Sequence, residues 1–377
     1  MKIISVVGAR PNFMKIAPFI SEVQKHDDIH HILVHTGQHY DVCMSLKFFK
    51  ELNIPEVDIN LDIGSGSHAE QVGETMIAFE KVLIKEQPDW VVVVGDVNAT
   101  LACSVTSKKL HIKVCHIEAG LRSGDLEMPE EINRLVTDRL SDLLLAPDKI
   151  AIENLKKEGV PDNKIKFVGN IMIDTLEANR KKAEELDIKN IIVRNFIEGQ
   201  SNIKISSRRS FCLITMHRPS NVDQRRILEP IIRFILDEVV VDLPVIWTIH
   251  PRTQTQLENF GLYEEILANE QLILLHPLGY HDMLKLNMES KIMFTDSGGL
   301  QEECTILGTP CLTLRWNTER PVTLMENGGA SILAGNDISC IRDKYKKIKK
   351  INCEPKRPDY WDGNTAFRCL QAVLDYK

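Results

Sequence analysis

Three features are missing from this chain of 377 residues, and each absence removes a class of protein. No apolar run approaches the roughly 18 residues that a membrane-spanning helix needs, which predicts that no segment crosses a membrane. No G-x-G-x-x-G motif occurs, so a nicotinamide cofactor is not supported. The nine cysteines include no C-x-x-C pair, which is typical of reduced thiols rather than of disulfides or a zinc site. We therefore predict neither a metal nor a cofactor.

The chain also lacks an excess of positive charge. It has 46 Lys and Arg residues against 53 Asp and Glu residues, a formal net charge of -7. Nucleic acids and anionic membranes bind basic faces by releasing counterions, so neither is an expected partner. Strand-like residues begin at Lys2 with no charged leader before them, which favours a cytoplasmic protein. Local basic residues can still bind one phosphorylated ligand.

Short apolar runs alternate with amphipathic segments, and this alternation predicts parallel sheets covered by helices. The expected strands are residues 3–7, 32–35, 90–95, 114–117, 143–146, 166–169, 211–215, 245–249, 272–275, 292–295 and 311–314. A polar run that ends near Arg209 interrupts the pattern and reads as a linker. Since a domain has roughly 100 to 200 residues, we predict two doubly wound α/β domains with a cleft between them.

Carboxylates and guanidinium groups crowd the stretch from Val114 to Arg134. Glu118 follows the expected strand 114–117, and Pro129 is suited to the first position of a helix. Glu130 and Arg134 are four residues apart, so they share a helix face that can be aimed at the strand end. Asp96 follows four valines and is either a turn residue or a second site carboxylate facing Glu118. The stretch predicts part of a binding site.

Two strand-to-helix turns have the composition of anion sites. Arg10 and Lys15 follow the first strand, although an ordinary turn with solvated side chains would look the same. The stretch from Asp296 to Glu303 follows the strand 292–295, and its glycines let backbone N–H groups approach a diphosphate. Glu303, about one and a half turns into that helix, could accept ribose hydroxyls. The alternative is a plain helix cap.

Two histidines occupy matching positions in the second half of the chain. His217 and His250 each end an expected strand, and each is followed within two residues by an arginine, Arg218 and Arg252. Ligands bind beyond the carboxyl ends of strands in open α/β sheets. We therefore expect both histidines to contact a ligand, with a structural role as the alternative.

Seven motifs together resemble the non-hydrolysing UDP-N-acetylglucosamine 2-epimerase family. They are Gly8-Ala9-Arg10-Pro11 with Lys15, Gly95-Asp96, His116-Ile117-Glu118-Ala119-Gly120-Leu121-Arg122, Pro129-Glu130-Glu131-Ile132-Asn133-Arg134, His217-Arg218, Asp296-Ser297-Gly298-Gly299-Leu300-Gln301-Glu302-Glu303 and Thr318-Glu319-Arg320-Pro321. The match covers nearly the whole chain, in order. The resemblance implies a GT-B fold of two Rossmann-like domains, 1–170 and 171–363, with the helix 364–377 returning to the first. It also implies a UDP-sugar substrate and a homodimer.

The resemblance assigns roles to individual residues. The implied catalytic residues are Asp96, Glu118, Glu130 and His217. The implied substrate-binding residues are Arg10, Lys15, Asp96, Glu118, Arg134, His217, Arg218, His250, Ser297, Gly298, Gly299, Glu303 and Arg320. We expect Arg122 and Arg134 to pair with the carboxylates of the cluster, with pairing to Glu127 or Asp138 as the alternative.

Inversion at C2 without a redox cofactor suggests a mechanism. Departure of UDP from C1 acidifies the neighbouring C2–H, so elimination to a 2-acetamidoglucal and re-addition of UDP invert the centre. Three alternatives stay open: a hydrolysing epimerase that releases UDP and N-acetylmannosamine, a glycosyltransferase and a non-catalytic sugar-nucleotide sensor. The opening Gly8-Ala9-Arg10-Pro11-Asn12-Phe13 also resembles relatives that act on UDP-diacetamido uronic acids, which leaves the sugar undetermined.

Overall fold

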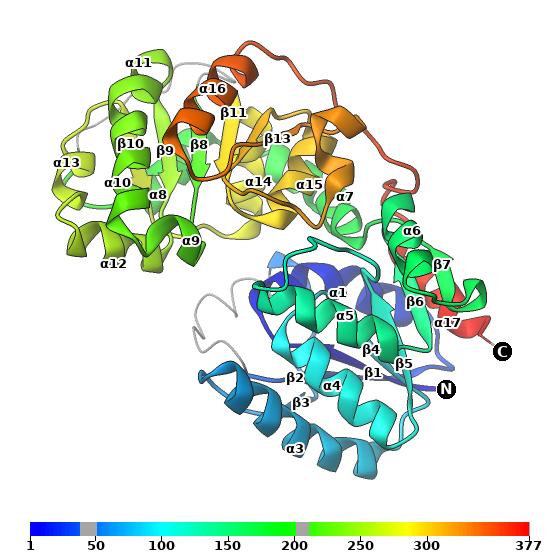
Figure 1. Cartoon of the computed structure of the whole chain (residues 1–377). Coiled ribbons are helices and arrows are strands. Elements are labelled where there is room, and N and C mark those ends of the chain that lie inside the picture. The colour runs from blue at the N-terminus through cyan, green and yellow to red at the C-terminus, as the bar shows by residue number, and fades with distance from the viewer. Residues whose placement is uncertain (38–50, 201–210, 377) are drawn as a thin grey trace. The chain divides into compact units, whose positions relative to one another are not determined.

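The structure is a computed structural model that describes residues 1–37, 51–200 and 211–376; the side chains of Arg10 and Pro11 are also outside the description. The chain forms two compact units (Figure 1). Unit 1 consists of Met1–Ala178 and Pro358–Lys377, and unit 2 of Asn179–Arg357. The division between the units falls within the helix α7 (Ile171–Glu184), between Ala178 and Asn179.

Unit 1 contains a parallel seven-stranded sheet in the order β3-β2-β1-β4-β5-β6-β7. The strands are β1 (Lys2–Val7), β2 (His30–His35), β3 (Ile59–Asn60), β4 (Trp90–Val94), β5 (Lys113–Ile117), β6 (Leu143–Ala146) and β7 (Ile165–Phe167). The helices are α1 (Arg10–Val23), α3 (His68–Glu86), α4 (Asn98–Lys109), α5 (Pro129–Leu140), α6 (Lys149–Lys157) and α17 (Thr365–Leu374), besides α7. All five residues of β4 are buried, as expected for a continuous apolar run covered on both faces.

Unit 2 contains a parallel six-stranded sheet in the order β10-β9-β8-β11-β12-β13. Its strands are β8 (Cys212–Thr215), β9 (Val245–Thr248), β10 (Leu272–Leu275), β11 (Ile292–Thr295), β12 (Cys311–Thr313) and β13 (Ser331–Leu333). Its helices include α8 (Ile188–Asn195), α9 (Pro219–Val222), α10 (Arg225–Phe234), α11 (Val240–Asp242), α12 (Pro251–Asn259), α13 (Tyr263–Leu267), α14 (Tyr280–Glu289), α15 (Gly298–Leu307) and α16 (Ile338–Ile348).

Two features of unit 2 differ from the expectation. The predicted linker contains the helix α8, which is capped by the Asp187 side chain and buries Ile191 against the core of the sheet. Ile188, Ile191 and Ile192 have the i, i+3, i+4 spacing of an amphipathic helix, but the polar residues around them favour the interpretation as a linker. The sheet also has a sixth strand, β13, whose three residues are too few to show an alternating pattern.

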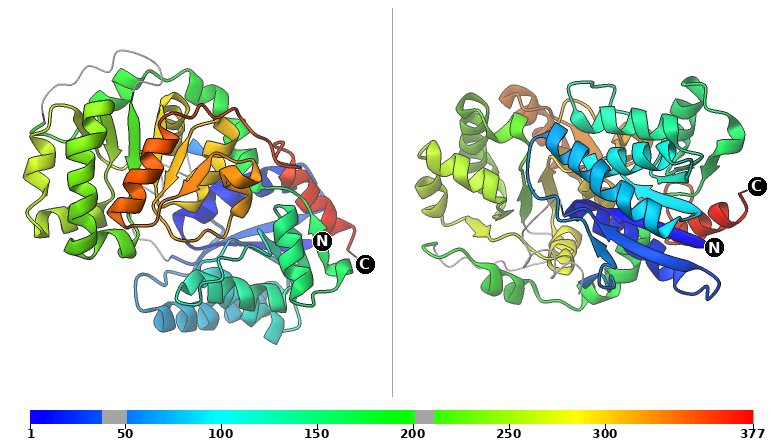
Figure 2. Two further views of the ribbon diagram at one scale, coloured as in Figure 1. Left: turned by 45° about the horizontal axis from the view of Figure 1, so that its top comes forward. Right: turned by 90° about the horizontal axis from the view of Figure 1, so that it is seen from below.

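The last segment of the chain completes unit 1. Trp361 is 1% exposed, and its indole N–H donates to the Pro147 carbonyl at 3.0 Å. Arg368 donates to the carbonyl of Val168 at 2.6 Å, and the helix α17 packs against α1. Both views of Figure 2 accordingly show the N- and C-termini close together. In the part of the chain that the structure describes, no helix is both long and apolar enough to cross a membrane.

Candidate active site

The strand orders place the predicted site residues at two switch points. Strand order reverses between β1 and β4 in unit 1, and between β8 and β11 in unit 2. The carboxyl ends of strands at such a point form the usual ligand site of an open α/β sheet. Asp96 follows β4 and Glu118 follows the neighbouring β5, while His217 follows β8 and Asp296 follows β11.

In unit 1, a lysine from α1 holds Glu118. The Lys15 ammonium forms an ion pair with the Glu118 carboxylate, and the two residues are 5% and 3% exposed. Glu118 has a φ of 71°, a left-handed conformation that costs a residue with a side chain about 1 to 3 kcal/mol. Such strain is kept where the surroundings fix it, and it is concentrated at functional sites. Lys15 and Glu118, which are 103 positions apart in the sequence, form one buried pair.

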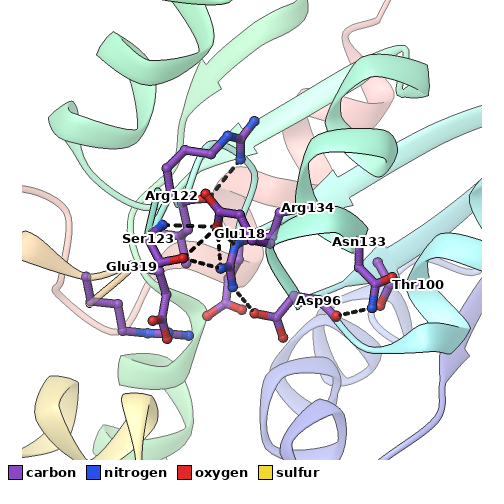
Figure 3. Close-up of polar contacts among 12 residues, drawn as sticks. Asp96, Thr100, Glu118, Arg122, Ser123, Asn133, Arg134 and Glu319 are labelled. Carbon is purple, nitrogen blue, oxygen red and sulfur yellow. Dashed lines mark hydrogen bonds and ion pairs between the residues drawn. The ribbon is translucent and has the colours of Figure 1, made fainter. Parts of the chain in front are cut away.

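Arg134 connects the second carboxylate to α5 (Figure 3). Its guanidinium donates to Asp96 at 2.5 Å and to Glu131 at 2.5 and 2.9 Å. Asn133 donates to the backbone carbonyl of Asp96 at 2.8 Å, so α5 holds both the side chain and the main chain of this residue. Asp96 keeps a side-chain exposure of 22%, whereas Arg134 is 1% exposed.

The carboxylate on α5 that pairs with Arg134 is Glu131. The sequence had suggested Glu130, because Glu130 and Arg134 share a helix face. Positions three and four apart are both neighbours on a helix, so spacing alone did not choose between them. Glu131 is 2% exposed and also accepts hydrogen bonds from the amides of Ser123 and Gly124. Glu130 is half-buried at the start of the same helix. Considering carboxylates both three and four residues before Arg134 would have identified Glu131 as well as Glu130.

Arg122 pairs within the structure of unit 1. It contacts Asp138 at 2.7 Å and forms a two-pronged ion pair with Glu158 at 2.7 and 2.8 Å. The alternative of pairing with Asp138 is therefore the one observed. Burial opposes the charge of Asp138, but His116, Arg122 and the Gly120 amide together hold the pKa of this carboxyl below its ordinary value.

In unit 2, Asp296 is the hub of the second cluster. It is fully buried and accepts hydrogen bonds from the amides of His217 and Arg218, at 3.0 and 2.8 Å, and from the Asn221 side chain. The His217 ring nitrogen Nδ1 lies 3.1 Å from the same carboxylate, and 42% of the His217 side chain is exposed. Although burial raises it, the pKa of Asp296 is lowered overall by His217 and these amides. The buried carboxylate of Asp296 therefore orients the His217 ring.

The two predicted histidines lie together. The ring centroids of His217 and His250 are 5.2 Å apart, with planes tilted by 33°. His250 caps α12 by accepting from the amide of Arg252, whose guanidinium pairs with Asp223 at 2.8 and 2.5 Å. Arg218 donates from Nε to the Asp296 carbonyl at 2.9 Å. The expected grouping at this sheet edge is therefore present.

The first turn of α15 lies over a buried arginine. Ser297 is the N-cap and forms no side-chain cap hydrogen bond. A Cβ atom added to Gly298 would lie 2.7 Å from the Arg320 guanidinium and 2.8 Å from Glu319, so a larger residue there would require these side chains to shift. Arg320 is paired with Glu302 at 2.7 Å and with Glu319. The start of α15, including Gly299, combines free helix N–H groups with a nearby cation, which suits an anion.

Glu303 lies deeper in the same helix. It is 3% exposed. Burial raises the pKa of this carboxyl to about 7; hydrogen bonds from Tyr280 and Asn287 oppose the rise, and the charge of Glu302 adds to it. A carboxyl with a pKa near neutrality can accept hydroxyl hydrogen bonds in one state and donate in the other. Sequence reasoning did not find Tyr280 or Asn287, which carry no motif.

Two remaining expectations concern the first loop and metals. The backbone of Arg10 begins α1, but its side chain lies outside the described residues. Asn12, one turn into the helix, accepts from the Ala9 amide and donates to the Val94 carbonyl at 2.7 Å, which ties this loop to β4. Within the described ranges, no group of three or more His, Cys, Asp or Glu side chains could hold a metal ion.

Comparison with known proteins gives a consistent result. Residues 21–374 match a family model described as UDP-N-acetylglucosamine 2-epimerase. A UDP-N-acetylglucosamine 2-epimerase of Methanocaldococcus jannaschii is 43% identical over 380 residues, covering 100% of this chain and 99% of that protein. A UDP-2,3-diacetamido-2,3-dideoxy-D-glucuronate 2-epimerase of Pseudomonas aeruginosa is 39% identical, covering 89% of this chain and 88% of that protein.

A solved structure has the same fold. The crystal structure of the Methanocaldococcus jannaschii UDP-GlcNAc 2-epimerase in complex with UDP-GlcNAc and UDP matches with a TM-score of 0.89 and 40% sequence identity. The match covers 100% of both chains. Together with the two doubly wound parallel sheets, it confirms the predicted GT-B fold class.

Proposed function

The chain belongs to the UDP-N-acetylglucosamine 2-epimerase family, and we propose that it interconverts UDP-N-acetylglucosamine and UDP-N-acetylmannosamine without hydrolysis. As an epimerase it is an isomerase. The proposal adds to family membership the sugar, the non-hydrolytic outcome and the roles of individual residues. The family resemblance also supports a cytoplasmic homodimer, which is part of the proposal.

One observation carries the proposal. Two carboxylates, Asp96 and Glu118, follow neighbouring parallel strands, and each is held by a different cation. A proton transfer at C2 needs one group that removes a proton and one that returns it to the other face. Lys15 and Arg134 fix two carboxyl groups separately, which is the arrangement such a pair requires. Glu130, at the start of α5, is a further candidate for one of the two transfers.

We assign stabilisation of the departing diphosphate to unit 2. The N-terminus of α15, with Ser297 to Gly299, presents helix N–H groups, and His217 is an exposed donor beside Asp296. Each charge-assisted contact of this kind is worth about 1 to 3 kcal/mol when water is excluded. Glu303 is assigned to the ribose hydroxyls, and Arg10, Arg218, His250 and Arg320 supply positive charge.

The reaction is an elimination followed by an addition. A carboxylate takes the C2 proton, the C2–H electron pair forms the C1–C2 double bond, and the C1–O bond breaks with its electrons going to UDP. The products are UDP and 2-acetamidoglucal. Protonation of C2 from the opposite face and return of the UDP oxygen to C1 give the epimer. No oxidant is needed, because the C1–C2 double bond makes C2 planar and so removes its stereochemistry without oxidation to a ketone.

The test uses UDP-N-acetylglucosamine in deuterated water, followed by NMR. Deuterium at C2 of both epimers, still linked to UDP, is the expected result. Release of free N-acetylmannosamine would instead identify a hydrolase, and absence of exchange would indicate a transferase or a sensor. Glu118→Gln should lower the exchange rate by about 10²- to 10⁴-fold, the usual contribution of a positioned acid or base, without loss of the folded state by circular dichroism. Wild-type exchange in that variant would refute the assignment.

A second substrate is favoured by one comparison. The relative named as acting on UDP-2,3-diacetamido-2,3-dideoxy-D-glucuronate is 39% identical to this chain. This compound differs from UDP-N-acetylglucosamine at C3 and C6 while the C1 and C2 chemistry is the same. The same NMR assay with both substrates separates the two candidates through the ratio of kcat/KM values.

A further inference from the structure

A fully buried histidine lies directly behind the two carboxylates of unit 1. His116 belongs to β5, two residues before Glu118, and is 0% exposed. Its Nε2 atom lies 2.8 Å from the carbonyl oxygen of Gly95, the residue before Asp96. Its Nδ1 atom lies 2.6 Å from the Asp138 carboxylate on α5. The reaction outlined above gives this side chain no part.

The partners of the His116 ring determine where its protons are. A backbone carbonyl only accepts, so Nε2 carries a proton and donates it to Gly95. Asp138 already accepts from the Gly120 amide at 2.9 Å and from Arg122 at 2.7 Å. These donors and His116 lower the pKa of Asp138 although burial opposes them, which keeps it a carboxylate. The Asp138 carboxylate is thus an acceptor next to Nδ1, and both ring nitrogens of His116 have a hydrogen-bond partner.

The His116 ring first fixes the peptide bond between Gly95 and Asp96. Gly95 has a φ of 69°, and its amide donates to the Ile117 carbonyl at 3.2 Å. A Cβ atom at this position would lie 3.1 Å from the Lys15 ammonium nitrogen and 3.5 Å from Glu118. Because the carbonyl of Gly95 is held by His116, rotation of the peptide between Gly95 and Asp96 would break a buried hydrogen bond.

The second peptide fixed by the pair follows Glu118. Asp138 accepts the N–H of Gly120, two residues after Glu118. Gly120 has a φ of 85°, and a Cβ atom there would lie 2.4 Å from the Ala151 carbonyl oxygen, so the backbone is packed tightly as well. One ion pair thus holds the main chain next to each of the two carboxylates.

We propose that the His116–Asp138 pair is a positioning device for the reaction, setting the directions of Asp96 and Glu118 through the peptides of Gly95 and Gly120. The proposal rests on the proposed function, since it concerns the two carboxylates assigned to proton transfer. A buried ion pair often contributes no net stability compared with apolar residues of the same size. Holding two backbone segments in one geometry is a use that compensates for this cost.

The test compares variants that remove the hydrogen bonds with one that keeps them. His116→Phe keeps a ring but donates to neither Gly95 nor Asp138. Asp138→Asn can keep every bond of the pair: its amide NH₂ donates to Nδ1 of a neutral His116, Nε2–H still donates to Gly95, and its oxygen accepts from Gly120. Asp138→Ala removes the acceptor of Gly120. The control is His31→Phe. In the wild type, the His31 ring contacts Ser5 on the neighbouring strand of the same sheet.

The readouts are kcat and KM from the deuterium-exchange assay, per mole of folded protein measured by circular dichroism. We expect His116→Phe and Asp138→Ala to lower kcat by about 10²-fold, the effect of misplacing reacting groups by about 1 Å. KM should change by less than about threefold, because binding of the nucleotide is assigned to unit 2. Asp138→Asn should lose less than about tenfold of kcat, and His31→Phe should keep the wild-type kcat.

Each contrary result overturns the proposal. Wild-type kcat in His116→Phe would show that the carboxylates do not depend on the pair. Equal losses in Asp138→Asn and Asp138→Ala would show that geometry is not what the pair supplies. If His116→Phe does not fold, the two Asp138 variants decide by themselves. Wild-type protein that exchanges no deuterium refutes the proposed function instead, so the two failures are distinguishable.

Discussion

At the scale of single residues, the site carboxyl groups of unit 1 and those of unit 2 lie in different electrostatic surroundings. Asp96 and Glu118 each have a cation within contact distance. Glu303 is buried near the neutral side chains of Tyr280 and Asn287 and lies next to the charge of Glu302. Burial without a cationic partner favours the neutral form of a carboxyl group, as it does for Glu303. The proposed function uses carboxyl groups in both kinds of surroundings.

The raised pKa of Glu303 predicts a pH dependence of stability. Burial raises this pKa from its ordinary value of 4.5 to about 7, so between these values the folded state binds more protons than the unfolded state. The free energy of unfolding therefore falls as pH rises from 4.5 to 7, by about 3 kcal/mol in total. Glu303→Gln carries no such charge, so its stability relative to wild type should increase between pH 5 and pH 8.

Urea unfolding at the two pH values, followed by circular dichroism, measures this difference. Glu354→Gln, at an exposed position of the same unit, is the matched control and should keep the pH dependence of the wild type. A Glu303→Gln variant whose stability relative to wild type is the same at pH 5 and pH 8 would contradict the raised pKa.

At the scale of elements, α5 organises the site in unit 1. Glu131 accepts from the amides of Ser123 and Gly124, at 3.0 and 2.9 Å, and pairs with Arg134, which in turn holds Asp96. The loop after β5 is thereby fastened to the helix that carries the cation. A single carboxylate links the loop to the arginine that orients Asp96.

Glu131→Ala should release this loop. Hydrogen bonds to a charged group contribute about 1.5 to 3 kcal/mol each, so the amides of Ser123 and Gly124 should exchange with solvent at least about tenfold faster. Hydrogen–deuterium exchange with mass spectrometry of the peptide that covers these amides measures the change. Glu127→Ala, an exposed residue of the same loop, should leave their exchange unchanged. Unchanged protection in Glu131→Ala would show that the loop is held by other contacts.

At the scale of the whole molecule, unit 1 is built from the two ends of the chain. Residues 358–377 return to it after all of unit 2. Trp361 is the buried anchor of this segment, with its indole donating to Pro147. Tyr376 meets Trp90 edge-on, with ring centroids 4.9 Å apart, at the first residue of β4. The stability of the sheet that carries Asp96 and Glu118 thus depends on the C-terminal segment.

Trp361→Ala should destabilise unit 1 by about 3 to 5 kcal/mol, the usual cost of emptying a buried aromatic site. The effect should be local. Hydrogen exchange of the core amides in β4 and β5 should accelerate, while amides in β8 and β9 of unit 2 keep their protection. Phe367→Ala, on α17 and 52% exposed, should change stability by less than about 0.5 kcal/mol. Equal acceleration in both units would refute a local role.

Much of this architecture was readable from local pattern. The valine run of β4 and the alternation of apolar and amphipathic segments predicted parallel sheets, because period and burial are properties of neighbouring residues. The helix α8 lies in a segment whose polar composition predicted a linker, although Ile188, Ile191 and Ile192 have helical spacing. The core that buries Ile191 is formed by strands that follow it in the chain.

The sequence by itself determined which polar residues stand at strand ends, and so brought Asp96, Glu118, His217 and Asp296 forward as site residues. Only the tertiary structure decided which charges meet. Arg134 has Glu130 and Glu131 at equally suitable helical spacings, and the packing of α5 against α4 and β5 directs it to Glu131 and Asp96. Likewise, the pairing of His116 with Asp138 and the Gly95 carbonyl joins three elements. Such partners are chosen by packing between distant segments, which local sequence periodicity does not encode.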